Sequence, residues 1–314
     1  MRRFLLSVLL CVALSGVAAC SGSNSEETTT SAARETSQVA ETTEVTTTEA
    51  PSDPGEPGTT TTVAALQVTR SLDYTVDGWS KLDVFAPTES GPWPVVVLIP
   101  GAFQHKSAYE FLAEEIASEG AVVFNVDVRT ENPFPAIEKV ACSVRFARAE
   151  AAAYGGDPTH ITLVGHSGGA ATGMVVALTG DEYARDCAVT DTTAELDALV
   201  GYEGPFDWAT QDYQGVNFTV LEETDPDQWE AINPYSHLGG NPDLVVRLIH
   251  GDDADVAWYE VPRAVSVEFD EVLLEAGYDT ELILLQDADH GALLQAGSEV
   301  VKVAVEQALQ PAHS

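Results

Sequence analysis

Basic residues are scarce in this 314-residue chain: 14 Lys and Arg stand against 50 Asp and Glu, which gives a formal net charge of −36. A surface with so much negative charge repels nucleic-acid phosphates and the head groups of anionic lipids. The composition therefore argues against nucleic acid as a partner and favours solubility.

Aromatic residues are absent between Phe4 and Tyr74. Most of this gap, residues 21–62, consists of Thr, Ser, Glu, Pro and Gly. Such a composition cannot bury enough apolar surface to fold, and its charges and prolines keep a chain extended. We therefore expect residues 20–65 to form a disordered linker and residues 66–314 to form one folded domain.

The apolar run near the N-terminus, Phe4–Leu14, is too short to be a membrane-spanning helix. Two arginines precede it and small residues follow it, which is the pattern of a secretory signal over residues 1–19. Val17–Cys20 resembles a bacterial lipobox, so we expect Cys20 to carry lipid and to hold the exported protein at a membrane surface of the cell envelope. The alternative is an ordinary signal peptide and a secreted protein.

Cysteines are few as well: the chain has four, and they lie in different parts of the sequence. Cys11 lies in the signal and Cys20 at the expected lipidation site. The remaining two, Cys142 and Cys187, form an even pair in an exported domain, where the surroundings are oxidising. We predict a disulfide between them; the alternative is two buried free thiols.

Apolar strand-like runs alternate with helical patterns through the folded part, and no internal repeat is visible. This alternation predicts an α/β fold with a mostly parallel central sheet and helices on both faces. The expected strands are 68–76, 81–85, 94–99, 121–126, 161–164, 196–202, 244–249 and 282–285, and the expected helices 107–118, 136–154, 170–178, 262–276 and 292–309.

The centre of the pattern is Gly165-His166-Ser167-Gly168-Gly169, which has the form G-x-S-x-G. An apolar β-branched run precedes it and a helix of small residues follows it, as a nucleophile elbow requires. The tight turn would expose the Ser167 hydroxyl and place the Gly168 N–H at a helix N-terminus, where it can bind an anion. We expect Ser167 to be a catalytic nucleophile.

A serine nucleophile needs a base, and the base needs an orienting acid. In α/β sheets these residues follow later strands in the order Ser, acid, His. His290, after the last expected strand, is the predicted base. Asp252, Asp253 and Asp255 follow the strand before it; Asp255 is the preferred acid and Asp253 the second choice.

With these residues the chain resembles the α/β-hydrolase superfamily, in particular the carboxylesterase branch with feruloyl and acetyl esterase-like proteins. The resemblance lies in residues 82–87 (LDVFAP), 95–101, 154–158 (YGGDP), 165–169, 248–251 and 288–291. It implies an α/β-hydrolase fold and covers most of residues 72–309.

Two features depart from that family's pattern. The family usually carries His-Gly-Gly at the oxyanion turn, whereas this chain has Pro100-Gly101-Ala102-Phe103. Because the donors are backbone N–H groups, Ala102 and Phe103 can still form an oxyanion hole with Gly168. The acidic loop also lies farther from Val261-Pro262 than is usual, which leaves the choice of acid open.

Together these features predict a serine carboxylesterase-type hydrolase that cleaves small or polymer-linked esters through an acyl-enzyme. We expect no cofactor, no metal and a monomer. Residues 204–241 are expected to form at most a small cap. Two alternatives stay open: a serine peptidase on the same fold, and a non-catalytic binding protein that retains the fold.

Overall fold

The computed structural model describes residues 41–43, 65–128, 133–207, 212–213, 216–217, 224–252 and 261–310. Nine strands form one sheet in the order β1-β2-β3-β5-β4-β6-β7-β10-β11. The strands are β1 (Glu41–Thr43), β2 (Leu66–Asp73), β3 (Lys81–Pro87), β4 (Trp93–Ile99), β5 (Val122–Val126), β6 (Gly156–His166), β7 (Ala198–Tyr202), β10 (Val245–Gly251) and β11 (Asp279–Leu285). β1, β2, β3 and β5 pair antiparallel in that order, and the pairs from β5 to β11 are parallel.

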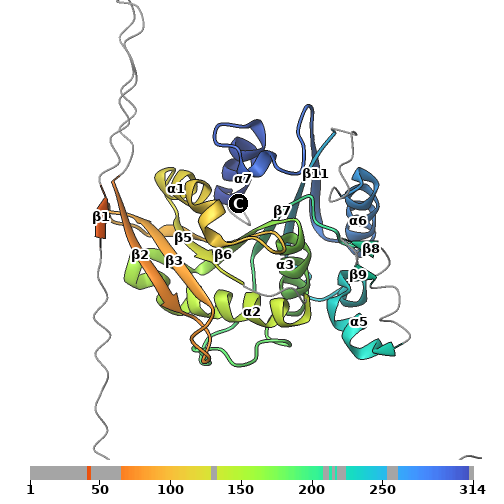
Figure 1. The fold of residues 1–314 in the computed structure, drawn as a ribbon, viewed down its shortest axis with the longest axis horizontal. Coiled ribbons are helices and arrows are strands. Elements are labelled where there is room, and N and C mark those ends of the chain that lie inside the picture. The colour runs from red at the N-terminus through yellow and green to blue at the C-terminus, as the bar shows by residue number, and fades with distance from the viewer. Residues whose placement is uncertain are drawn as a thin grey trace, which may run out of the picture. The chain divides into compact units, whose positions relative to one another are not determined.

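Helices cover both faces of this sheet (Figure 1). The α-helices are α1 (Glu110–Ser118), α2 (Pro133–Glu150), α3 (Gly168–Thr179), α5 (Pro226–Ile232), α6 (Arg263–Ala276) and α7 (Glu299–Leu309). Short 3-10 helices lie at η1 (Lys106–Tyr109), η2 (Ala151–Tyr154), η5 (Pro234–His237) and η6 (Ala292–Leu294). This is the α/β architecture that the sequence predicts.

The alternation of side chains along β4 divides the core between the two faces. Val95, Val97 and Ile99 belong to the same apolar cluster as α2, α3 and α6. Val96 and Leu98 belong to the second cluster, with α1 and α7. All five are fully buried, because a strand covered on both faces exposes neither set of side chains to water.

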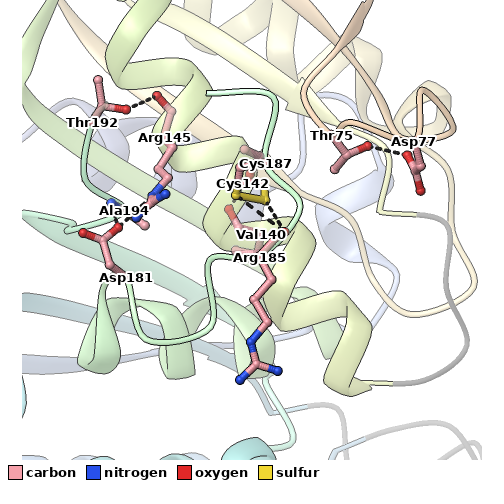
Figure 2. Close-up of a disulfide and its surroundings, with 11 residues drawn as sticks. Thr75, Asp77, Val140, Cys142, Arg145, Asp181, Arg185, Cys187, Thr192 and Ala194 are labelled. Atoms are coloured by element: carbon pink, nitrogen blue, oxygen red, sulfur yellow. Dashed lines mark hydrogen bonds and ion pairs between the residues drawn. A yellow bond between two sulfur atoms is a disulfide. The ribbon is translucent and has the colours of Figure 1, made fainter. Parts of the chain in front are cut away.

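The disulfide predicted from the sequence is present between Cys142 of α2 and Cys187 of the loop after α3 (Figure 2). The same loop is held by Arg145, whose guanidinium lies 2.9 Å from Asp181. Asp181 also accepts the N–H of Ala194, at 2.7 Å. These links fasten the long connection between α3 and β7 to helix α2.

Some boundaries differ from the prediction. The helix expected over 292–309 is two helices, η6 and α7, because Gly297 has a φ of 76° and Ser298 caps α7 by accepting the Val301 N–H. The strand β1 lies within the segment expected to be a disordered linker. No helix in the described residues is long and apolar enough to cross a membrane.

The segment expected to be a small cap contains a short hairpin, β8 (Asp212–Tyr213) and β9 (Val216–Asn217), followed by α5 and η5. Part of it packs into the domain rather than standing above it. Phe206 is fully buried and its ring stacks on Phe269 of α6, with centroids 4.5 Å apart. Residues 208–211, 214–215 and 218–223 of the segment lie outside the described residues.

Candidate active site

Ser167 occupies the turn between β6 and α3, where its backbone has φ 52° and ψ −124°. Its N–H donates to the carbonyl of Tyr202 on β7, at 2.8 Å. The turn has no room for side chains on either side. A Cβ on Gly165 would lie 2.7 Å from the backbone of Ala170, and one on Gly169 would lie 2.3 Å from the Pro100 carbonyl. The glycines of the motif are therefore required by close backbone approach, as in a nucleophile elbow.

Beside the elbow, the start of α3 meets the turn after β4. A Cβ on Gly168 would lie 3.0 Å from the Cβ of Ala102 and 3.3 Å from its backbone nitrogen. The first N–H groups of an α-helix have no partner within the helix. The backbone of Gly168 thus lies against Ala102 beside the Ser167 turn. Phe103 follows with φ 64° and is half exposed.

His290 lies in the loop after β11, and among the described residues the carboxylate of Glu203 lies against it. The Nδ1 of His290 is 2.7 Å from Oε2 of Glu203. The second oxygen of Glu203, Oε1, accepts the N–H of Gly251 at 3.0 Å. Both His290 and Glu203 are buried. A carboxylate in this position fixes the proton on Nδ1, which leaves Nε2 as the basic nitrogen of the ring.

Glu203 directly follows β7, the strand next to that of the elbow. Its φ is 45°, and its N–H donates to the Ile249 carbonyl of β10 at 3.0 Å. A positive φ is uncommon for a residue other than glycine and is concentrated at functional sites. Ser167, Glu203, Phe103 and Asp287, which all follow strands at one end of the sheet, have a positive φ, as do three residues elsewhere among those described.

Of the three aspartates that the sequence offers as the acid, the structure describes only Asp252. Asp255 and Asp253 lie outside the described residues, so both stay predictions. Asp252 is described, and its Oδ1 accepts the N–H of Asp287 at 2.7 Å. Asp252 thus joins the acidic loop to the loop that carries His290. Glu203 is not among the acids predicted from the sequence; its only sequence signal is that it directly follows an apolar strand.

Residues of β6 and β7 hold the loop of His290 through hydrogen bonds. His166, the residue before Ser167, has its Nε2 2.9 Å from the His290 carbonyl, and the two rings lie 4.8 Å apart. The Tyr202 hydroxyl donates to the carbonyl of Asp289. Burial, followed by the neighbouring His290, lowers the pKa of His166 to about 3, so this ring is neutral near pH 7. The segment that carries Ser167 and the loop of His290 are therefore directly joined by hydrogen bonds.

A second buried histidine, His250, lies on the other side of Glu203. Its Nε2 is 4.0 Å from Oε1 of Glu203, and its Nδ1 is 2.8 Å from the hydroxyl of Ser266. Burial lowers the pKa of His250 below the ordinary value. A neutral ring here adds no charge next to the carboxylate. Among the described residues, no group of three His, Cys, Asp or Glu side chains is placed to hold a metal ion.

Residues 82–273, more than half of the chain, match the BD-FAE family. The chain belongs to the BD-FAE family. This BD-FAE protein is 24% identical over 258 residues to the probable isoprenylcysteine alpha-carbonyl methylesterase ICMEL1 of Arabidopsis thaliana, covering 71% of this chain and 51% of the relative. It is 30% identical over 142 residues to Esterase LipC of Mycobacterium tuberculosis, covering 42% and 34%. The chain thus spans about half the length of the plant relative and a third of LipC.

Solved structures agree on the fold. A truncated carbohydrate esterase from gut microbiota has a TM-score of 0.60 at 21% identity, covering 77% of this chain and 96% of that one. The butyrate-bound esterase Est2 of Thermogutta terrifontis has a TM-score of 0.61 at 20% identity, covering 78% and 92%. The fold of this BD-FAE protein is that of the α/β hydrolases, as the sequence predicts, and the names of relatives and neighbours agree with the predicted class of carboxylesterase-type hydrolase.

Proposed function

We propose that this protein hydrolyses carboxylic esters, with Ser167 as nucleophile, His290 as base and Glu203 as the orienting acid. The observation that carries the proposal is the buried contact between His290 Nδ1 and Glu203 Oε2, 2.7 Å long. His166, the residue before Ser167 on the elbow, bonds to the carbonyl of the same His290 at 2.9 Å. Family membership and the names of the relatives support the same class of reaction.

In the proposed reaction, Nε2 of His290 takes the hydroxyl proton of Ser167 while the Ser167 oxygen attacks the ester carbonyl carbon. Glu203 stays ionised, holds the proton on Nδ1 and stabilises the imidazolium that forms. The tetrahedral intermediate collapses when His290 gives its proton to the leaving alcohol, and an acyl-enzyme remains on Ser167. Water, activated by His290, then releases the acid and restores the serine.

The negative charge of the tetrahedral oxygen is assigned to backbone N–H groups. Gly168 supplies one from the start of α3, and Ala102 or Phe103 supplies another from the turn after β4. The close approach of Gly168 to Ala102 supports this assignment. The loss of one such donor typically lowers the rate by about 10²–10³. Neither step needs a metal or an organic cofactor.

The substrate class is a small or polymer-linked ester. The relatives and neighbours are named as methylesterases and as a carbohydrate esterase, so the substrates in their names share the ester bond and differ in the rest. The proposed site of action is outside the cytoplasm, with the chain tethered through lipid on Cys20, or secreted if residues 1–19 are an ordinary signal. We take the protein to act as a monomer.

The test is hydrolysis of p-nitrophenyl acetate, butyrate and octanoate by the wild type and by Ser167→Ala. We expect turnover by the wild type and none above background by the variant. Equal rates in both, or no hydrolysis by the wild type, would refute the proposal. Aminopeptidase substrates measured in parallel separate an esterase from a peptidase on the same fold.

A further inference from the structure

A continuous chain of hydrogen bonds runs beneath the proposed site, from the oxyanion turn to the base. The N–H of Gly101 donates to the hydroxyl of Tyr109, at 2.9 Å. That hydroxyl lies 2.5 Å from Nδ1 of His166. The Nε2 of His166 lies 2.9 Å from the carbonyl oxygen of His290. This series of hydrogen bonds thus begins at the residue before Ala102 and ends at the peptide of His290, the proposed base.

The direction of each bond follows from the groups at its ends. A carbonyl only accepts, so Nε2 of His166 carries the proton and donates to His290. A neutral imidazole then has an unprotonated Nδ1, which accepts the hydroxyl proton of Tyr109. Since that hydroxyl has one proton, its oxygen is left to accept from Gly101. The Oε1 of Gln104 also lies against the hydroxyl, so this pattern requires the Gln104 amide to be turned over, with its NH₂ group in that place. Every donor and acceptor of the two linking side chains is used.

Burial makes this arrangement rigid. Tyr109 is fully buried and His166 is 2% exposed, so water does not compete for their hydrogen bonds. An unmade bond here would leave a buried polar group unpaired, which costs about 1–3 kcal/mol. Burial also keeps the pKa of His166 low and raises that of Tyr109, so both side chains keep the protonation that the chain of bonds requires.

We propose that Tyr109 and His166 are positioning residues. They hold the oxyanion turn and the loop that carries His290 at a fixed position relative to each other. The inference rests on the proposed function, in which Ala102 and His290 act on opposite sides of the same tetrahedral carbon. A displacement of about 1 Å in such a site can cost on the order of 10² in rate. Tyr109 and His166 connect the two sides from underneath without contacting the substrate.

The test compares Tyr109→Phe, His166→Leu and the double variant. Each single change breaks the same chain, so each is expected to lower kcat by about 10–100-fold and to leave KM within about threefold. The double variant should be no slower than the slower single variant. Both changes interrupt the same series of hydrogen bonds, so their effects on kcat are not additive. Rates are taken per active site, counted by the burst of p-nitrophenol, so that unfolded protein does not enter them.

Two further variants separate positioning from packing. His166→Gln keeps a donor and an acceptor on one planar group and should recover several-fold of the kcat lost in His166→Leu. A role in packing alone predicts the opposite, since leucine fills an apolar space without an unpaired polar group. Tyr278→Phe is the matched control for Tyr109→Phe: its hydroxyl is also buried and also binds backbone, accepting from Gly239 at 2.8 Å and donating to Gly240 at 2.6 Å. It should keep wild-type kcat.

The outcomes distinguish this inference from the proposed function. If wild type and Ser167→Ala hydrolyse esters equally, the proposed function fails, and this inference fails with it. If the wild type depends on Ser167 while Tyr109→Phe and His166→Leu stay within twofold of its kcat, only this inference is overturned. The inference would also be overturned if the losses of kcat in the two single variants multiply in the double variant. A kcat of His166→Leu above that of His166→Gln would overturn it as well.

Discussion

The assignment of Glu203 as the acid gives the sharpest prediction, because glutamine cannot replace both of its hydrogen bonds. One carboxylate oxygen accepts Nδ1–H of His290 and the other accepts the N–H of Gly251. In Glu203→Gln one of these positions holds an NH₂ group. If the NH₂ faces Gly251, two donors oppose each other in a buried place. If it faces His290, the ring must take the tautomer with the proton on Nε2, which cannot accept the proton of Ser167.

The size of the effect follows from that tautomer. A wrong tautomer of the catalytic histidine costs about 10⁴ in kcat in the Ser-His-Asp case. Part of the population can instead keep the correct tautomer at the cost of the unfavourable contact with Gly251, about 1–3 kcal/mol. We therefore expect Glu203→Gln to lower kcat by roughly 10³–10⁴, with KM changed little, because the lost interaction acts on the transition state.

The assay is p-nitrophenyl butyrate hydrolysis, with Asp255→Asn and Asp253→Asn as matched carboxylate-to-amide controls. Both controls are expected to keep kcat within about fivefold of the wild type. Circular dichroism and thermal unfolding check that each variant is folded. If Asp255→Asn loses 10³ or more while Glu203→Gln stays near the wild type, the acid lies in the loop after β10 and the assignment of Glu203 is wrong.

Three other predictions follow from the same contacts. The pKa of His166 is about 3 in the folded protein and 6.5 ordinarily; the unfolded chain therefore binds the extra proton, and the free energy of unfolding should fall by about 1.4 kcal/mol for each pH unit below 6.5. Urea unfolding of His166→Gln between pH 7 and 4 should lack this contribution. The disulfide spans 45 residues, so replacing Cys142 and Cys187 together by serine should cost about 2–4 kcal/mol in urea unfolding and leave kcat per site unchanged. Cys20→Ser should move the exported protein from the detergent phase to the aqueous phase in a Triton X-114 partition, and a wild type found only in the aqueous phase would contradict lipidation.

The sequence predicts the tight turn at Ser167 well because the elbow is tightly constrained. Gly165 and Gly169 approach backbone atoms too closely for any side chain, and an apolar strand must precede the turn. Few other arrangements of a chain satisfy both conditions. The alternation of strands and helices is similarly constrained, since strands buried on both faces must be continuously apolar.

The acid is harder to predict, because the choice depends on distances between strand ends that are far apart in the sequence. Glu203 reaches His290 across 87 residues, and only the pairing of β10 with both β7 and β11 brings them together. From the sequence, the Asp-rich loop after β10 presents more candidates, and the chain order of Ser, acid and His fits that loop and Glu203 equally. The single glutamate after β7 is distinguished only by its positive φ and its burial, neither of which is visible in the sequence.

The break between η6 and α7 has a local cause. Apolar residues continue through the whole range 292–309 and indicate one helix, but Gly297 takes a left-handed φ of 76° and Ser298 begins a new helix as its cap. Glycine and serine in succession are a typical end and start of helices. The break could therefore be found in the sequence by weighting these signals above periodicity.

The central claim, that Ser167 carries the acyl group, is tested most directly by mass spectrometry of the acyl-enzyme. Wild-type protein is mixed with p-nitrophenyl butyrate, quenched in acid during the burst and digested. The account predicts one butyryl group per active site, on the peptide that contains Ser167, and none in Ser167→Ala. A butyryl group on another residue that turns over at the rate of hydrolysis would contradict it, as would hydrolysis by Ser167→Ala at the wild-type rate.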